Sequence, residues 1–208
     1  MVETAYSKKG DKEPRFILSS FAKELLSPQH FDIVADCYKQ VPMHCLLFRH
    51  GIAESPGKWG DEFTRPLTQE GITKTQHAIE GLHRIGIQPT HLLCSPLTRT
   101  QQTAAILKDI LSVPNDIQTV PELMYDQSPR LLFSILQACP PHTCVVCVGH
   151  EPHLGQTASL MVFGDHSNGL SIKKAGACLI SFSANVDVGK GQLEWWIPPA
   201  QLRTLRKG

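Results

Sequence analysis

Two short apolar runs, each ending abruptly in polar residues, constrain the fold of this 208-residue chain more than any other feature. The first, residues 43–48, leads directly into Arg-His-Gly at 49–51, and the second, residues 144–148, leads into Gly-His at 149–150. A strand that is buried on both faces of an α/β sheet has such a continuous apolar sequence. Open α/β sheets bind their ligands at the carboxyl ends of the strands. The runs therefore predict a buried sheet with a polar site at one edge.

The rest of the chain alternates between strand-like apolar runs and segments whose apolar residues recur at helical spacing. This alternation predicts an α/β fold with a mostly parallel central sheet, covered by helices in an α/β/α sandwich of three layers. We expect strands at 43–49, 90–94, 117–120 and 144–148, closing strands at 170–173, 177–183 and 192–197, and helices at 68–84, 95–111, 128–138 and 153–162.

Helix boundaries are marked by residues that favour helix ends. Thr68 is a good N-cap, and Gly86 is suited to end the helix that follows. Ser95 is a second candidate N-cap, because Pro96 would then occupy the first helical position, where proline is tolerated best. This start places Arg99 in the first turn of its helix, and a cation there suggests an anion for it to bind.

The sequence divides into three parts of different character. Residues 1–40 are predicted to be an N-terminal extension, partly disordered and partly helical, whose role the sequence does not indicate. Residues 41–200 contain the alternating pattern and are expected to form one domain. Residues 201–208 are basic and are expected to form a loose tail.

The overall composition excludes several functional classes. The net charge is +1, which does not indicate binding to nucleic acid or to an acidic membrane surface. No apolar run approaches the roughly 18 residues of a membrane-spanning helix, and residues 1–10 lack the apolar core of a secretion signal. The seven cysteines are an odd number and scattered, which favours a reducing compartment. We therefore expect a cytoplasmic protein, as a monomer or weak dimer.

Four cationic or titratable side chains follow the expected strands on one edge of the sheet. Arg49 and His50 follow the first strand, Arg99 the second, and His150 the fourth. The planar fork of arginine matches the oxygens of a phosphate group, and a neutral histidine is a competent nucleophile. Phosphoryl transfer depends mainly on positioning and charge neutralisation, both of which these side chains could supply. The group therefore indicates phosphate chemistry.

These residues also carry a resemblance to a known family. The chain resembles the histidine phosphatase superfamily over about residues 43–197, and within it the small SixA-like phosphohistidine phosphatases. The superfamily motifs are Arg49-His50-Gly51, Ser95-Pro96-x-x-Arg99-x-x-Gln102-Thr103 and Gly149-His150. The features that resemble SixA are Arg65-Pro66-Leu67-Thr68-x-x-Gly71, Pro121-Glu122-Leu123 and Gly149-His150-x-Pro152.

The resemblance implies a phosphoglycerate mutase-like fold and a metal-independent phosphatase without cofactor. His50 would accept the phosphoryl group, Arg49 and Arg99 would bind its oxygens, and His150 would share in that binding. Arg65 at the entrance and the backbone at Gly51 are further candidate substrate-binding positions. The substrate would be a phosphorylated small molecule or a protein that carries phosphohistidine.

The proton donor and the substrate stay open at this stage. Glu122 is favoured over Asp126 as the general acid, Glu54 is a third candidate, and a phosphohistidine substrate could react without one. A sugar or glycerate phosphatase, or a mutase of the same superfamily, is the alternative enzyme, although the short loops disfavour a mutase. A non-catalytic phosphate-binding module is the alternative from another class.

Overall fold

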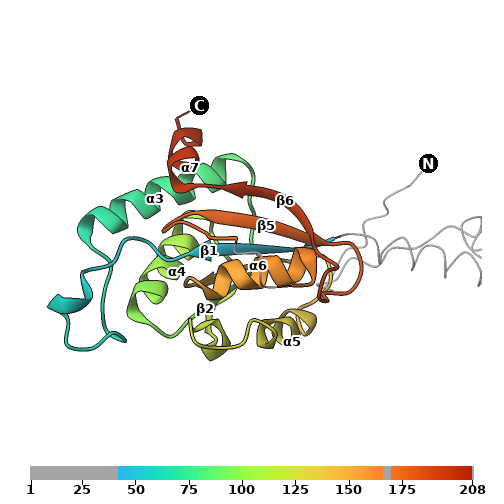
Figure 1. Ribbon diagram of the computed structural model, residues 1–208. Coiled ribbons are helices and arrows are strands. Elements are labelled where there is room, and N and C mark those ends of the chain that lie inside the picture. The colour runs from blue at the N-terminus through green and yellow to red at the C-terminus, as the bar shows by residue number, and fades with distance from the viewer. Residues whose placement is uncertain (1–41, 166–169, 208) are drawn as a thin grey trace, which may run out of the picture. The chain divides into compact units, whose positions relative to one another are not determined.

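A computed structural model describes residues 42–165 and 170–207 of the chain, so the extension predicted for residues 1–40 lies outside the described part. Within that part, a six-stranded sheet lies between two layers of helices (Figure 1). The strands are β1 (Met43–Arg49), β2 (His91–Cys94), β3 (Ile117–Thr119), β4 (Cys144–Gly149), β5 (Ala177–Phe182) and β6 (Gln192–Ile197).

The strand order is β3-β2-β4-β1-β5-β6. Strands β3, β2, β4 and β1 are parallel neighbours, whereas β5 is antiparallel to β1 and β6 is antiparallel to β5. This confirms the predicted α/β fold with a mostly parallel sheet. The reversed strand β5 has a consequence for the site: the residues that precede it lie at the same edge as the residues that follow β1 and β4.

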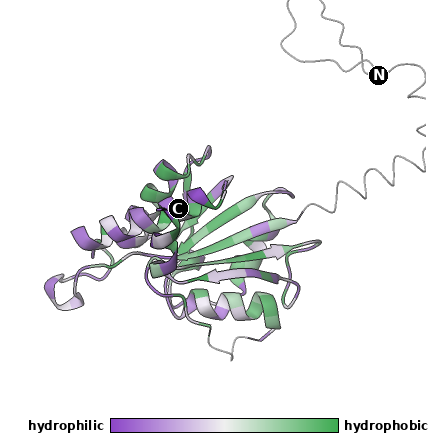
Figure 2. Ribbon diagram, turned by 90° about the horizontal axis from the view of Figure 1, so that it is seen from above, coloured by the Kyte–Doolittle hydropathy of each residue, from purple (hydrophilic) through white to green (hydrophobic). Residues whose placement is uncertain are grey.

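Helices cover both faces of the sheet, and side chains of one strand alternate between them. In β1, Leu46 and Phe48 pack with the helices α3 (Gln69–Arg84), α4 (Thr98–Ile110) and α7 (Pro199–Leu205). Cys45 and Leu47 pack on the opposite face with α5 (Leu131–Gln137) and α6 (His153–Phe163). Figure 2 shows the apolar strands between these layers. No helix in the described part of the chain has the length and apolar character to cross a membrane.

The boundaries of α3 are those that the sequence predicts. The Thr68 hydroxyl accepts a hydrogen bond from the backbone N–H of Gly71 at 2.8 Å, which satisfies one free donor of the first turn. At the other end Gly86 has a φ of 80°, a left-handed conformation that glycine adopts without strain.

The prediction that Ser95 caps the next helix is wrong. Helix α4 begins at Thr98 with Leu97 at the N-cap position, and no side chain caps it. The reason is that the Ser95 hydroxyl is bound elsewhere, to His150 in the site described below. Arg99 nevertheless lies in the first turn of α4, as predicted.

Two further expectations differ from the structure. Residues 170–173 are not a strand but part of a loop that precedes β5. The end of the chain is not loose as far as Leu205, because α7 packs against α3. Leu202 is fully buried there, and a Cβ atom on Gly81 would lie only 2.0 Å from the Leu202 carbonyl oxygen. Because Gly81 has no side chain, α7 can approach α3 closely, and the basic residues at the end of the chain are therefore part of a helix that packs on α3.

Candidate active site

The parallel strands β1, β2 and β4 bring the predicted site residues to one edge of the sheet. Arg49 pairs in register with Gly149, so His50 and His150 follow adjacent strand ends. The His50 and His150 ring centroids are 5.1 Å apart. The structure therefore brings together side chains that lie 100 residues apart in the sequence, as the predicted topology requires.

The imidazole of His50 is held in one tautomer. Its Nδ1 lies 2.7 Å from the Gly51 carbonyl oxygen, and because a carbonyl can only accept, Nδ1 carries the proton. Nε2 therefore has a free lone pair. Burial lowers the pKa of His50 well below its ordinary value, and the neighbouring His150, Arg99 and Arg49 lower it further. The ring is thus neutral near pH 7, the form in which a histidine is nucleophilic.

His150 lies beside the nucleophile candidate and is oriented by a serine. Its Nε2 is 2.9 Å from the Ser95 hydroxyl, and the edge of Tyr125 approaches it with a centroid distance of 6.0 Å. Burial, and then the charge of Arg99, lowers the pKa of His150 to about 3. When Ser95 donates its proton to Nε2, Nδ1 of the neutral ring is left as a donor.

Arg49 and Arg99 come from different elements, the end of β1 and the first turn of α4. Arg49 donates from Nη1 to the Ile172 carbonyl at 2.9 Å, in the loop before β5. Arg99 is only 2% exposed and binds Glu62, with Nη1 3.0 Å from its carbonyl oxygen and Nη2 2.9 Å from its carboxylate. Burial lowers the pKa of each arginine. Both side chains nevertheless keep their positive charge, because arginine stays protonated in proteins.

Glu62 joins Arg99 to the predicted entrance residue Arg65. The Arg65 guanidinium donates to both oxygens of the Glu62 carboxylate, at 2.8 Å and 2.5 Å, and from Nη1 to the Glu54 carbonyl at 2.8 Å. The hydrogen bond with Arg65 lowers the pKa of Glu62, so its carboxyl is ionised at neutral pH. The positive charge of Arg65 acts on Arg99. Arg65 is therefore part of the same charged group.

The loop that carries Glu62 is tied at its base. An antiparallel bridge joins Ala53 to Leu67, and the Glu54 N–H donates to the Pro66 carbonyl at 2.9 Å. The backbone N–H of Leu67 also donates to the Gln102 side chain at 2.7 Å. The loop includes a 3-10 turn at Pro56–Lys58, and the hydrogen bonds at its base hold its two ends together.

Three buried nitrogens around His50 have no hydrogen-bond partner among the described residues. They are Nε of Arg49, Nε of Arg99 and Nδ1 of His150. An unsatisfied buried polar group is costly, and such groups are rare in native proteins. One anion beside His50 could accept from all three, so we refer to Arg49, Arg99 and His150 together as the anion clamp.

Among the described residues, neither Glu122 nor Asp126 forms a hydrogen bond or salt bridge with His50 or His150. Glu122 is in the 3-10 turn Pro121–Leu123, and within the described residues its side chain forms no hydrogen bond or salt bridge. The charge of Asp126 acts on His153. The carboxylate whose charge acts on His150 is that of Glu62, from the loop. Glu62, which was not among the predicted acids, acts on His150 from its position beside Arg99.

The backbone of Gly51 is used to position its neighbours. Its carbonyl orients the His50 ring, and its N–H donates to the Thr103 hydroxyl at 3.2 Å. A Cβ atom here would lie 2.2 Å from Thr75 Oγ1, so a larger residue would separate the site from α3. Gly51 therefore fixes the nucleophile candidate through close packing.

Sequence reasoning did not single out Glu62, Tyr125 or Lys174 as part of the site. Lys174 lies in the loop before β5, and burial together with the charges of Arg49, Arg65 and Arg99 lowers its pKa. The placement of Lys174 depends on the antiparallel direction of β5, which the sequence of that strand does not indicate. For Glu62 and Tyr125 the sequence likewise contains no signal.

The described residues contain no group of three or more His, Cys, Asp or Glu side chains arranged to hold a metal ion. Cys144 and Cys147, which have a C-x-x-C spacing, are free thiols in β4. Burial raises the pKa of Cys144 to about 12, so this thiol is not a reactive thiolate.

The buried histidines make an acid-dependent loss of stability the expected result. His150 has a pKa lowered to about 3 and His153 one lowered to about 4, both because of burial, and the pKa of His50 is also well below 6.5. The unfolded chain binds more protons than the folded one below pH 6.5. The free energy of unfolding should therefore fall between pH 7.5 and pH 5, by about 2 kcal/mol for each histidine.

Urea unfolding at the two pH values measures this loss, and His153→Gln isolates one histidine. The variant should lose about 2 kcal/mol less than wild type over the same interval. Glu62, whose pKa is lowered, changes the free energy of unfolding with pH only below pH 4.5. Glu151, whose pKa is raised by burial, adds the same pH dependence to both proteins. An identical loss in both proteins would contradict a buried neutral His153.

Comparison with known protein families agrees with this geometry. A profile of the histidine phosphatase superfamily (branch 1) matches residues 45–124. An uncharacterized protein of Picosynechococcus is 34% identical over 140 residues, which cover 64% of this chain and 82% of that protein. The phosphohistidine phosphatase SixA of Escherichia coli is 23% identical over 166 residues, which cover 79% of this chain and 99% of SixA.

Solved structures share the fold. A structure of the protein histidine phosphatase SixA with tungstate matches with a TM-score of 0.68 and 22% identity, over 77% of this chain and 99% of that one. A putative alpha-ribazole-5′-phosphate phosphatase from Escherichia coli matches with a TM-score of 0.55 and 19% identity, over 76% and 97% of the two chains. At these identities the likeness shows the fold, which is the phosphoglycerate mutase-like fold that the sequence predicted.

Proposed function

We propose that this chain, which belongs to the histidine phosphatase superfamily and is a phosphatase, hydrolyses phosphohistidine through a covalent intermediate on His50. The observation that carries the proposal is the neutral His50 ring beside the anion clamp. Its Nδ1 is committed to the Gly51 carbonyl, so the lone pair of Nε2 is free, and one buried nitrogen in each of Arg49, Arg99 and His150 lacks a partner among the described residues.

The reaction has two steps. Nε2 of His50 attacks phosphorus and forms a P–N bond, while the bond from phosphorus to the leaving nitrogen breaks and its electron pair goes to that nitrogen. Water then attacks phosphorus, the P–N bond to His50 breaks, the ring becomes neutral again, and the water proton passes to phosphate. Arg49, Arg99 and His150 neutralise the oxygens in both steps, so no metal is needed for charge stabilisation.

Within the described residues no carboxyl group forms a hydrogen bond with the ring of His50 or His150, which favours phosphohistidine over an oxygen ester. An imidazole that is protonated on its other nitrogen leaves as a neutral molecule, whereas an alkoxide needs a proton from a general acid. The carboxylate that acts on His150 is Glu62, and its lowered pKa keeps it ionised. An ionised Glu62 cannot supply the proton that an alkoxide leaving group would need.

A side-by-side hydrolysis assay in the presence of a chelator tests the proposal. We expect the full chain to release phosphate from a phosphohistidine peptide at least about tenfold faster, in kcat/KM, than from sugar phosphates, phosphoglycerates or an aryl phosphate. Preference for one of the oxygen esters would instead make it a small-metabolite phosphatase and would require Glu122 or Asp126 as proton donor. Hydrolysis that stops with the chelator would contradict the metal-independent mechanism.

A further inference from the structure

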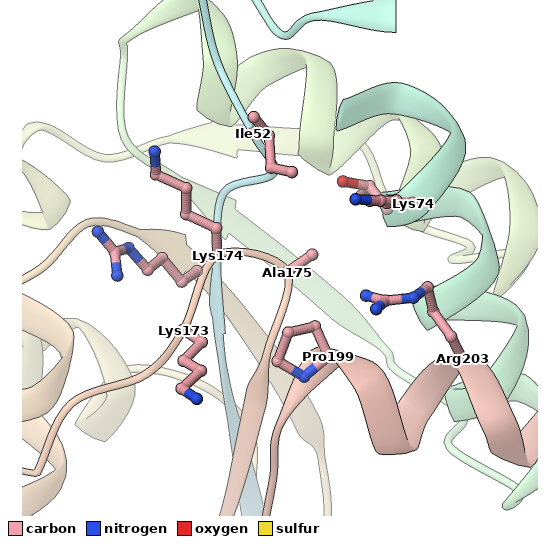
Figure 3. Close-up of a pocket in the computed structure, with 9 residues that line it drawn as sticks. Ile52, Lys74, Lys173, Lys174, Ala175, Pro199 and Arg203 are labelled. Atoms are coloured by element: carbon pink, nitrogen blue, oxygen red, sulfur yellow. The ribbon is translucent and has the colours of Figure 1, made fainter. Parts of the chain in front are cut away.

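A cavity of about 530 Å³ opens beside the anion clamp, between α3, α7 and the loop before β5 (Figure 3). Lys74 and Arg203 lie on the two helices at one side of the cavity, and Lys174 lies on the loop at the other. No carboxylate is among its nine lining residues, and five of them are cations: Arg49, Lys74, Lys173, Lys174 and Arg203.

The positive charge of this cavity is largely uncompensated. Lys74 pairs with Glu70 on the same helix, but Lys173, Lys174 and Arg203 form no salt bridge within residues 42–165 and 170–207. Like charges gathered at one place repel each other, and this chain has a net charge of only +1. A local concentration of cations in a nearly neutral chain favours an anionic ligand.

Thr75, on α3, also lines the cavity, but its hydroxyl lies against Gly51. A Cβ atom on Gly51 would lie 2.2 Å from Thr75 Oγ1, and that oxygen is buried. The groups that the cavity offers to an anion are therefore its cations.

We propose that this cavity binds a second acidic group of the substrate, a carboxylate or a phosphate, while His50 and the anion clamp hold the phosphoryl group. Arg49 belongs to both places, because it lines the cavity and directly precedes His50. The proposal rests on the proposed function and specifies the substrate further: the acidic group is either a side chain that flanks phosphohistidine in a protein or the second acid of a small phosphorylated molecule.

Matched pairs of substrates test the proposal. One pair is a phosphohistidine peptide with flanking Asp residues and the same peptide with Asn. The other pair is phosphoglycerate and glycerol phosphate, which differ in one carboxylate. We expect wild type to prefer the acidic member of at least one pair by about tenfold in kcat/KM, and the pair that shows the preference identifies the source of the acid.

The double variant Lys74→Gln/Arg203→Gln should abolish this preference and change the rate on the neutral member by less than about twofold. The matched control Arg84→Gln/Lys190→Gln removes the same charge from exposed positions outside the cavity and should retain the preference. Arg84 lies on the same helix as Lys74, about 15 Å along it. Equal loss on both members of a pair, or no preference in wild type, would overturn the proposal.

Binding separates this proposal from the proposed function. Fluorescence anisotropy with phosphoserine forms of the two peptides, in the His50→Asn background, measures the preference without turnover. The acidic peptide should bind more tightly than the neutral one, and Lys74→Gln/Arg203→Gln should remove this difference. That result would support binding of an acidic group in the cavity even if no substrate were hydrolysed. Equal binding of both peptides, together with equal binding of phosphoglycerate and glycerol phosphate in the same background, would contradict the cavity even in an active phosphatase.

Discussion

His50→Asn should reduce kcat by at least about 10⁴-fold and abolish the phosphoenzyme. The asparagine amide can donate to the Gly51 carbonyl as Nδ1 does, but it has no nucleophilic lone pair in place of Nε2. The anion clamp is untouched, so binding of phosphate should persist. The change therefore removes the covalent step and keeps the local geometry.

Trapping measures the covalent step directly. Wild type mixed with a labelled phosphohistidine donor and denatured in alkali should retain label in a form that acid releases, as a phosphoramidate does. His83→Ala, at an exposed position on α3, is the control and should trap as wild type does. If wild type never retains label, and His50→Asn binds phosphate as wild type does, the chain is a phosphate-binding module.

Arg99→Lys is expected to reduce kcat/KM by about 10²-fold or more, which corresponds to roughly 3 kcal/mol of transition-state stabilisation. Lysine keeps the charge but loses the planar fork. In the structure that fork binds Glu62 with two nitrogens and leaves its third, Nε, without a partner. A point charge cannot hold the loop and a phosphate oxygen at once.

Steady-state kinetics with the preferred substrate measures the effect. Arg206→Lys is the matched control, because Arg206 forms an ion pair with Glu80 at 3.2 Å outside the site, and it should stay within about twofold of wild type. Turnover of Arg99→Lys within a few-fold of wild type would mean that Arg99 does not contact the transferred group.

Features set by neighbouring residues could be read from the sequence. Thr68 caps α3 because its partner, Gly71, is three residues away. Arg49, His50 and His150 meet because continuous apolar strands must be buried side by side, and their ends then share an edge. These inferences need only local pattern and the general rules of α/β topology.

Features set by partners that are distant in the sequence could not be read from it. Ser95 has a good capping sequence, but its hydroxyl binds His150, 55 residues away. The direction of β5 is not encoded in its own pattern, so the loop before it, with Lys174, was not placed at the site. Leu202 is buried because α7 meets Gly81, which the basic character of the last residues does not reveal.

The charged loop was the least predictable part of the site. Glu62 is one of several polar residues between Gly51 and Arg65, and its side chain is partly exposed. Its place beside Arg99 depends on how the loop closes through Ala53 and Leu67, which is a tertiary property.

The order of the strands also determines how the chain can fold as it is synthesised. Strand β1 is the first strand in the described part of the chain, yet its parallel neighbour β4 follows 100 residues later, since His44 pairs with Cys144. Its other neighbour, β5, is made later still. At about 5–20 residues per second, a ribosome exposes the apolar β1 for roughly 5–20 seconds before any partner exists. The segment that carries the nucleophile candidate is thus the one that most needs protection from aggregation during translation.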